Sequence, residues 1–205
     1  MSVFTINNGW LELLEPQDDI EVLGVEALDV VPLDSEVLDL QPSSHCDERE
    51  CDDISLLVVH NISLPPGQFG SDHITDLFLG RLNPDEHEYF KAIYQFRVSA
   101  HCLIRRDGKV VQYVPFDKRA WHAGVSSFCD REKCNDFSIG IEMEGTDELP
   151  YTDAQYAQLQ TITKVLLAHY PQMNTDRIVG HSDIAPGRKT DPGDSFDWLK
   201  YKQGL

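Results

Sequence analysis

The sequence predicts an α/β protein in which helices flank a mixed central β-sheet. Three observations support this prediction. A β-branched run at 54–60, ISLLVVH, is typical of a buried strand, and an Asp-Gly pair at 107–108 separates two further apolar runs. A helical periodicity then extends over residues 152–170. With 205 residues, the chain is long enough to bury a sizeable core around such a sheet.

The first half of the predicted domain contains one strand and a divided helical region. The run at 54–60 delivers His60 at its carboxyl end, and a loop with two prolines and two glycines, NISLPPGQFG, follows it. Residues 73–96 have helical character. We expect an interruption near Asn83-Pro84, because proline removes a backbone donor.

A hairpin and a second strand come next. The segments SAHCLIRR and KVVQYVP flank the Asp-Gly pair, which is a strong hairpin signal. Residues 137–144, FSIGIEME, are expected to form a strand with alternating faces. One face carries Ile139, Ile141 and Met143, and the other carries Gly140, Glu142 and Glu144.

The longest helix is predicted from Thr152 to Tyr170. Thr152 can cap it, Gln155 completes a capping box, and apolar residues recur at helical spacing. A short strand at 177–180 and a closing helix within 194–202 complete the predicted elements.

Acidic residues dominate the N-terminal quarter of the chain. Residues 1–48 contain twelve Asp and Glu but no Lys or Arg, and the formal net charge of the whole chain is −18. We interpret 1–48 as an acidic segment with a flexible insertion at about 15–38; an acidic docking segment is the alternative. Residues 49–205 form the main domain, and its organised core is expected to begin near residue 52.

Charge and hydropathy exclude several classes of partner. An acidic surface repels nucleic-acid phosphates and anionic membranes, so neither is expected to bind. No apolar run approaches the roughly 20 residues that span a bilayer. The N-terminus does not read as a secretory signal, and an odd number of cysteines, five, fits a reducing compartment. A cytoplasmic location is therefore expected.

The loop GHSDIAPGRKTDPG at 180–193 gathers many ionisable groups between prolines and glycines. Such a composition predicts neither regular helix nor strand. It is either a solvated surface turn or half of a metal site. Two imidazoles and one carboxylate make a catalytic zinc shell, so His60, His181 and an acid are candidates. Spacing alone does not choose Asp183 or Asp191 as that acid, nor does it exclude His101 and His122.

Five blocks of the sequence resemble one protein family. They are LLVVHNISLPPG (56–67), RVSAHCLIRRDGKVVQYVPFDKRAWHAGVS (97–126), CNDFSIGIEMEGTD (134–147), YTDAQY (151–156) and GHSDIAPGRKTDPG (180–193). From about residue 42 to 200 the chain is similar to the zinc N-acetylmuramoyl-L-alanine amidases, a family that includes phage amidase lysozymes and peptidoglycan recognition proteins. The fold of that family is thereby implied for this chain.

The resemblance implies a catalytic set. His60, His181 and Asp191 would be ligands of one zinc ion, Glu142 the general base and Lys189 the oxyanion stabiliser. Asp183 is left with a supporting or capping role. The implied reaction is hydrolysis of the amide between the lactyl group of 1,6-anhydro-N-acetylmuramic acid and L-alanine, in cytoplasmic peptidoglycan recycling.

Substrate contacts are also implied by matching positions. Trp121 and His122 belong to the block WHAG, which lines the groove of the family, and Asn61 and Arg97 match positions that can hold polar parts of the ligand. The fork of an arginine suits a carboxylate. His101 and Glu144 are interpreted as structural.

Two other functions remain possible at this point: a lytic amidase that acts on polymeric peptidoglycan, and a muropeptide-binding module without activity. The full set of proposed ligands and catalytic groups argues against the binding module. The expected partner is a small anhydromuropeptide, and the expected state is a monomer.

Overall fold

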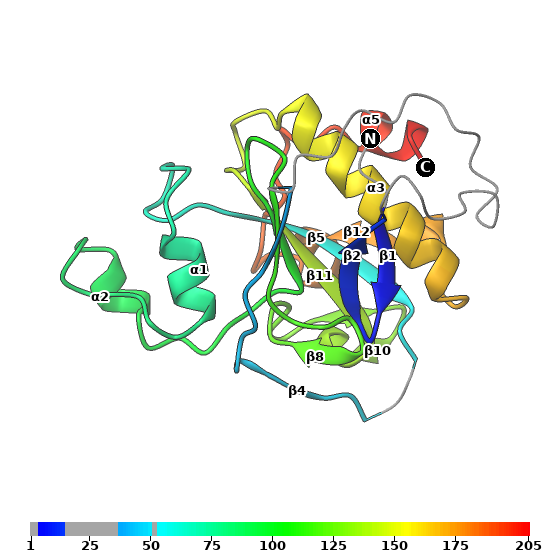
Figure 1. Cartoon of the computed structure of the whole chain (residues 1–205), viewed down its shortest axis with the longest axis horizontal. Coiled ribbons are helices and arrows are strands. Elements are labelled where there is room, and N and C mark those ends of the chain that lie inside the picture. The colour runs from blue at the N-terminus through cyan, green and yellow to red at the C-terminus, as the bar shows by residue number, and fades with distance from the viewer. Residues whose placement is uncertain (1–3, 15–36, 51–52) are drawn as a thin grey trace.

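A computed structural model describes residues 4–14, 37–50 and 53–205. At its centre lies a six-stranded sheet with the order β12-β5-β11-β6-β7-β3 (Figure 1). In that order the strands span Ile178–Gly180, Leu56–Ile62, Ser138–Glu144, Cys102–Ile104, Val110–Gln112 and Leu38–Leu40. The predicted α/β fold with a mixed central sheet is confirmed.

The sheet is mixed because of one hairpin. Strands β12, β5, β11 and β6 run parallel, whereas β6 and β7 pair antiparallel across the expected turn at Asp107-Gly108. Gly108 has a φ of +92°, a conformation that glycine adopts without steric cost. Strand β3 then pairs parallel to β7 and forms the edge of the sheet.

One face of the sheet is covered by α3, Asp153–His169, and by α5, Trp198–Gln203. Thr152 caps α3 and forms the expected capping box with Gln155. The core on this face contains alternate residues of the strands and one stripe of the helix: Leu57, Val59, Ile139, Ile141, Met143, Tyr156, Leu159, Ile162 and Leu166. The alternation predicted for residues 137–144 is therefore confirmed on its apolar side.

The opposite face is covered in two parts. Helices α1, His73–Phe78, and α2, Phe90–Ile93, pack over β6 and β7, and in Figure 1 they lie at one end of the view, well away from α3 and α5. The expected interruption between them is confirmed. A second cluster joins Leu56 and Val58 to Ala123, Phe137 and Ile184. Between the two clusters, this face of β5 and β11 is left for polar side chains.

Short elements connect these layers. Strand β4, Cys46–Glu48, pairs with β8, Lys118–Ala120, and β9, Ser127–Phe128, pairs with β10, Arg131–Glu132. Residues 134–136 and 175–177 form single 3-10 turns. Among the helices of the described ranges, none is both long and apolar enough to cross a membrane.

The core begins closer to the N-terminus than residue 52, where the sequence analysis placed its start. Strands β1, Phe4–Asn7, and β2, Trp10–Leu13, form a hairpin whose Phe4 and Leu11 are buried in the α3 cluster. Gln112 fastens this hairpin: its Oε1 accepts from Leu11 N at 2.7 Å and its Nε2 donates to Gly9 O at 2.9 Å. The insertion expected at about 15–38 lies almost wholly outside the described residues.

A single helical turn corrects the prediction that residues 180–193 contain no regular structure. Helix α4 spans His181–Ile184 and ends before Pro186. The Asp183 carboxylate accepts a hydrogen bond from Gly180 N at 2.7 Å, so the side chain satisfies a backbone donor that the helix start leaves free. Asp183 thus has the capping role expected of it. The glycines and prolines that argued against a helix all fall outside this turn.

Glu144 anchors the loop between β5 and α1. Its side chain is buried at the end of β11, where one carboxylate oxygen accepts from Gly70 N at 2.7 Å and the other from Arg106 N at 3.0 Å. These bonds give Glu144 a structural role: it ties the loop at 63–72 to the β6–β7 hairpin.

We predict that Glu144→Ala lowers the free energy of unfolding by about 3 kcal/mol, because two backbone donors lose a charged acceptor. Glu144→Gln should lose about half as much, since its remaining oxygen still accepts one bond. Urea unfolding in the presence of a chelator measures both values. Equal stability of the wild type and Glu144→Ala would contradict this role.

Candidate metal centre and active site

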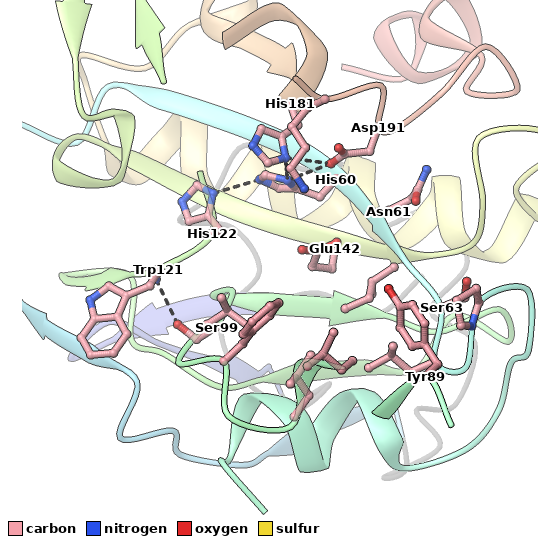
Figure 2. Close-up of a pocket in the computed structure, with 18 residues that line it drawn as sticks. His60, Asn61, Ser63, Tyr89, Ser99, Trp121, His122, Glu142, His181 and Asp191 are labelled. Atoms are coloured by element: carbon pink, nitrogen blue, oxygen red, sulfur yellow. Dashed lines mark hydrogen bonds and ion pairs between the residues drawn. The ribbon is translucent and has the colours of Figure 1, made fainter. Parts of the chain in front are cut away.

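A cavity of about 400 Å³ opens on the polar part of the sheet, between the two clusters described above. Figure 2 shows the imidazoles and carboxylates at one side of this cavity and a mostly apolar wall at the other. The polar side is lined by His60, Asn61, His122, Glu142, His181, Lys189 and Asp191. Five of these seven residues belong to the metal and catalytic set implied by the family resemblance.

Parallel strand pairing brings the polar residues together. His60 lies opposite Glu142 in the register of β5 with β11, and Gly180 lies opposite Val59 in the register of β12 with β5. His181 follows Gly180 at the start of α4. Because the carboxyl ends of parallel strands meet at one edge, three segments far apart in sequence deliver their side chains to one place.

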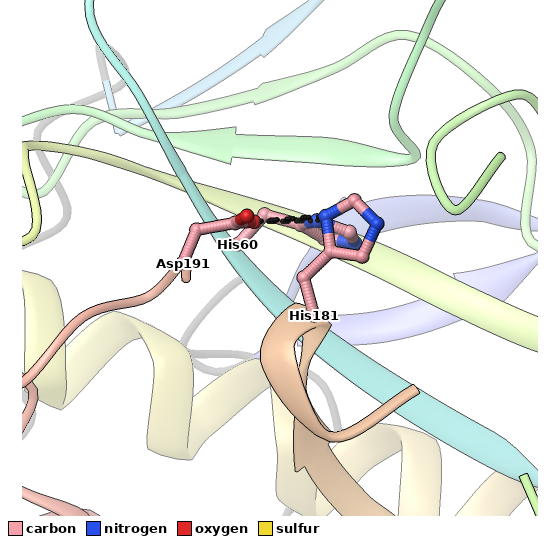
Figure 3. A group of neighbouring side chains, drawn as sticks. All are labelled: His60, His181 and Asp191. Carbon is pink, nitrogen blue, oxygen red and sulfur yellow. Dashed lines mark hydrogen bonds and ion pairs between the residues drawn. The ribbon is translucent and has the colours of Figure 1, made fainter. Parts of the chain in front are cut away.

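Three ligand-type atoms form a small triangle (Figure 3). The two imidazole Nδ1 atoms of His60 and His181 are 2.9 Å apart, and Asp191 Oδ2 lies 3.1 Å from the first and 3.0 Å from the second. In the described part of the chain, these three side chains form a group that can hold a metal ion. Zinc bonds of about 2 Å at tetrahedral angles separate ligand atoms by about 3.3 Å, so the triangle has a fitting size.

The hydrogen bonds of His181 also fit a metal. Its Nε2 lies 3.0 Å from Ala123 O, and a carbonyl oxygen only accepts, so Nε2 carries the hydrogen. In a neutral imidazole Nδ1 is then an unprotonated donor atom that points at the triangle. Asp191 supplies the negative charge: burial opposes its ionisation, but the close contacts of its carboxylate with His181 and His60 outweigh burial and lower the pKa of the carboxyl.

Burial keeps the first imidazole neutral. The side chain of His60 is almost fully enclosed, and burial, opposed by the hydrogen bond to Asp191, lowers its pKa to about 4. A neutral imidazole is the form that binds metal, so His60 has no proton to lose at neutral pH before a metal binds.

Glu142 is a buried carboxylate with spare hydrogen-bonding capacity. It is 8% exposed, and its Oε2 has no hydrogen-bond partner among the described residues. Burial, and then the negative charge of Asp191, raise the pKa of Glu142 well above its usual value, while Lys189 acts in the opposite direction. A carboxyl group whose pKa is raised in this way can exchange protons during a reaction.

Lys189 enters the cavity from the loop after α4. Its backbone N donates to Ala185 O at 3.1 Å, which closes a separate turn after α4, and the residue is exposed while lining the cavity. The ammonium group therefore has freedom to approach a bound ligand.

The four residues expected to contact substrate occupy different places. Asn61 and Trp121 line the cavity, and Asn61 Nδ2 donates to Asp147 Oδ1 at 2.7 Å. Arg97 is outside the set of described residues that line it; its guanidinium lies over the Trp121 ring, 5.5 Å from the centroid. His122 lines the cavity, but its Nδ1 lies 2.9 Å from His60 Nε2.

His101, another residue that spacing alone did not exclude, is a packed residue. It is fully buried, Gly140 N donates to its Nδ1 at 3.0 Å, and burial lowers its pKa to about 3. It lies outside the metal-capable triangle, as the interpretation of His101 as structural requires.

The apolar wall of the cavity was not predicted from the sequence. This wall contains Leu64, Leu77, Tyr89, Ile93 and Phe96. Its signal was present in the stretch EYFKAIYQF at 88–96, where aromatic residues recur too often for one buried helix face. Tyr89 and Phe96 are exposed, at 43% and 53%, which marks a surface that can receive a ligand.

The fold and this site define the class of protein. A family model described as N-acetylmuramoyl-L-alanine amidase matches residues 50–194, and the chain belongs to this family. The resemblance seen in the sequence is therefore confirmed.

Individual proteins of this family are similar to the chain over most of its length. The 1,6-anhydro-N-acetylmuramyl-L-alanine amidase AmpD of Salmonella typhimurium (strain SL1344) is 63% identical over 162 residues, which cover 78% of this chain and 86% of that protein. A crystal structure of a selenomethionine AmpD derivative matches with a TM-score of 0.83 and 53% identity over 98% of both chains. A crystal structure of AmpDh3 from Pseudomonas aeruginosa in complex with anhydromuramic pentapeptide matches with a TM-score of 0.57 and 30% identity, over 74% of this chain and 60% of that one.

The buried histidines predict an acid-sensitive metal-free protein. The pKa values of His60, His101 and His122 are lowered by burial, so below about pH 6.5 the unfolded chain binds protons that the folded chain does not. Each histidine then removes up to about 1.4 kcal/mol of stability per pH unit, down to its own folded pKa. Glu142 has a raised pKa, so it binds a proton more readily in the folded chain, and its contribution to stability offsets that of about one of the three histidines.

We therefore expect the free energy of unfolding without metal to fall by about 3 kcal/mol between pH 6.5 and 5. Urea titrations at pH 7, 6.5, 6, 5.5 and 5 with a chelator present measure this slope. A flat profile would show that these imidazoles are protonated in the folded state.

Proposed function

We propose that this chain hydrolyses, with the help of zinc, the amide between the lactyl group of 1,6-anhydro-N-acetylmuramic acid and L-alanine of the stem peptide, in cytoplasmic peptidoglycan recycling. The observation that carries the proposal is the triangle of His60, His181 and Asp191 beside the buried Glu142. Membership of the amidase family and 63% identity to a protein named for this reaction support it.

The proposed zinc site uses His60 Nδ1, His181 Nδ1 and Asp191 Oδ2, whose mutual distances of 2.9 to 3.1 Å suit the ion. Bound there, zinc would supply a Lewis acid and lower the pKa of a coordinated water to about 7. Two neutral imidazoles and one carboxylate leave a fourth position free, which is the ligand set of a catalytic site.

Proton transfer is assigned to Glu142. Its carboxylate takes a proton from the attacking water and passes it to the leaving nitrogen of L-alanine. The carbonyl carbon gains a C–O bond and loses its C–N bond, which yields a lactyl carboxylic acid and a free amine. Support comes from the buried position of Glu142 and from an oxygen, Oε2, that has no partner among the described residues.

Lys189 is assigned the role of stabilising the negative charge that develops on the substrate. The amide oxygen becomes negative as water attacks, and an ammonium group from the loop after α4 stabilises it. Loss of one such donor costs roughly 3–4 kcal/mol of barrier in other amide-cleaving enzymes.

Substrate binding is proposed to use both sides of the cavity. Asn61 and Trp121 line it, with Trp121 offering an aromatic face to the sugar or peptide. Arg97 is exposed over the Trp121 ring, where it suits a carboxylate of the stem peptide. The apolar wall at Tyr89 and Phe96 completes the cavity.

We assign the zinc amidase domain to residues 49–205, with the acidic segment at 1–48 adding strands to its core. Every proposed catalytic residue comes from one chain, so we propose that a monomer is active.

The substrate test compares 1,6-anhydro-N-acetylmuramyl-tripeptide with intact peptidoglycan, and mass spectrometry follows the free stem peptide. We expect rapid release from the small substrate, loss of release with a chelator, and recovery with added zinc. Release from the polymer at a similar rate would indicate a lytic amidase. If the zinc-loaded protein binds the small substrate but does not cleave it, the chain is a muropeptide-binding module without activity.

The ligand and base assignments predict opposite effects of two substitutions on the zinc content of the protein. His181→Ala should lose zinc during purification, because one of three protein ligands is gone. Glu142→Gln should retain one zinc per chain and lose at least about 100-fold in kcat, because the amide cannot accept the proton. Zinc content by atomic absorption, with kcat measured alongside, separates the two. Full activity of Glu142→Gln would overturn the assignment of the base.

A further inference from the structure

The dipeptide His122-Ala123 contacts both imidazoles of the metal-capable triangle at the nitrogen that is not part of the triangle. His122 Nδ1 lies 2.9 Å from His60 Nε2, and Ala123 O lies 3.0 Å from His181 Nε2. Figure 2 shows the His122 ring beside His60, on the side away from Asp191. One short segment therefore contacts the Nε2 atom of each proposed histidine ligand.

We propose that His122 is a positioning residue: it accepts the Nε2 hydrogen of His60 and, together with the Ala123 carbonyl, orients the two imidazoles toward zinc. This inference rests on the proposed zinc site. It gives His122 a role as a buried polar partner, beside the substrate contact that the family resemblance implies.

Hydrogen placement follows from the contacts. His60 presents Nδ1 to His181 and Asp191, so with a metal there its only hydrogen is on Nε2. His122 Nδ1 must then accept, which places the hydrogen of His122 on its own Nε2. Ser138 Oγ lies 3.2 Å from that nitrogen and accepts it. The chain of groups thus allows only one tautomer of each ring.

The His122-Ala123 segment is itself fixed by contacts with Asn135 and with Gly140. Asn135 Oδ1 accepts from His122 N at 3.2 Å and from Ala123 N at 2.8 Å, so one side-chain oxygen anchors both residues. The His122 ring lies directly over Gly140, where an added Cβ would come within 2.4 Å of it. Gly140 and Ser138 occupy the same face of β11 as Glu142. A rigid support of this kind is typical of groups that orient metal ligands.

The test measures zinc affinity in the absence of substrate, by competition with a chelating dye. Four variants are compared with the wild type: His122→Ala, His122→Gln, Ser138→Ala and, as a control, Phe96→Ala. Phe96 lines the same cavity from its apolar wall. Ser138 is fully buried and outside the residues that line the cavity, so its effect cannot come from substrate contact.

We expect His122→Ala to raise the Kd for zinc by about 10- to 100-fold. His122→Gln should recover part of this loss, because its amide oxygen can accept from His60. Ser138→Ala should show a smaller increase, and Phe96→Ala should keep the wild-type Kd. Thermal unfolding of each metal-free variant checks that the fold is intact, and His122→Gln and Ser138→Ala decide the matter if His122→Ala fails to fold.

Wild-type zinc affinity in His122→Ala and His122→Gln, with only KM raised, would overturn the proposal and return His122 to a substrate contact. The proposed function fails separately: a wild type that binds zinc tightly but cleaves no muropeptide would disprove the reaction and leave the test of His122 in force. A wild type that does not bind zinc would overturn both.

Discussion

Parallel pairing of β5 with its two neighbours is the constraint on which the site depends. The register with β11 sets Glu142 beside His60, and the register with β12 starts α4 so that His181 faces the same edge. A slip of one residue in either register would turn the side chains of that strand to the opposite face of the sheet. The apolar alternation of β11 against α3 prevents such a slip, because it would bury Glu142 and Glu144 in the core and expose Ile141. Packing on one face thus maintains the chemistry on the other.

The polar face has a cost in stability that the apolar face offsets. Three imidazoles and a carboxyl group are held there in surroundings that shift their pKa values away from the ordinary ones. Burial of this kind is expensive unless hydrogen bonds compensate, and every nitrogen of these three rings has a hydrogen-bond partner in the structure. Glu142 differs, because its Oε2 has no hydrogen-bond partner among the described residues, at the position where a reaction needs an available oxygen.

Much of this arrangement could be predicted from the sequence. Local patterns were sufficient for the strand at His60, the hairpin at Asp107-Gly108 and the long helix, because propensity and amphipathic spacing act over a few residues. The metal ligands required the family resemblance, since spacing alone could not choose between Asp183 and Asp191. The partners of His122 were beyond both routes: they depend on a ring lying over Gly140, which is a contact between segments that no periodicity encodes. The N-terminal hairpin was missed because residues 1–48 were interpreted as one acidic segment, although Asn8-Gly9 is a turn signal between two short runs with apolar residues.

The attachment of that hairpin through Gln112 has a consequence for synthesis of the protein. Leu11 and Gly9 are made before the side chain that receives them, which comes 101 and 103 positions later. At about 5–20 residues per second, a ribosome needs roughly 5–20 s to reach that partner. During this interval Phe4 and Leu11 have no core to enter, so the nascent chain exposes apolar side chains until most of the sheet is made. The acidic residues that follow Leu11 keep the waiting segment charged, and like charges repel neighbouring nascent chains.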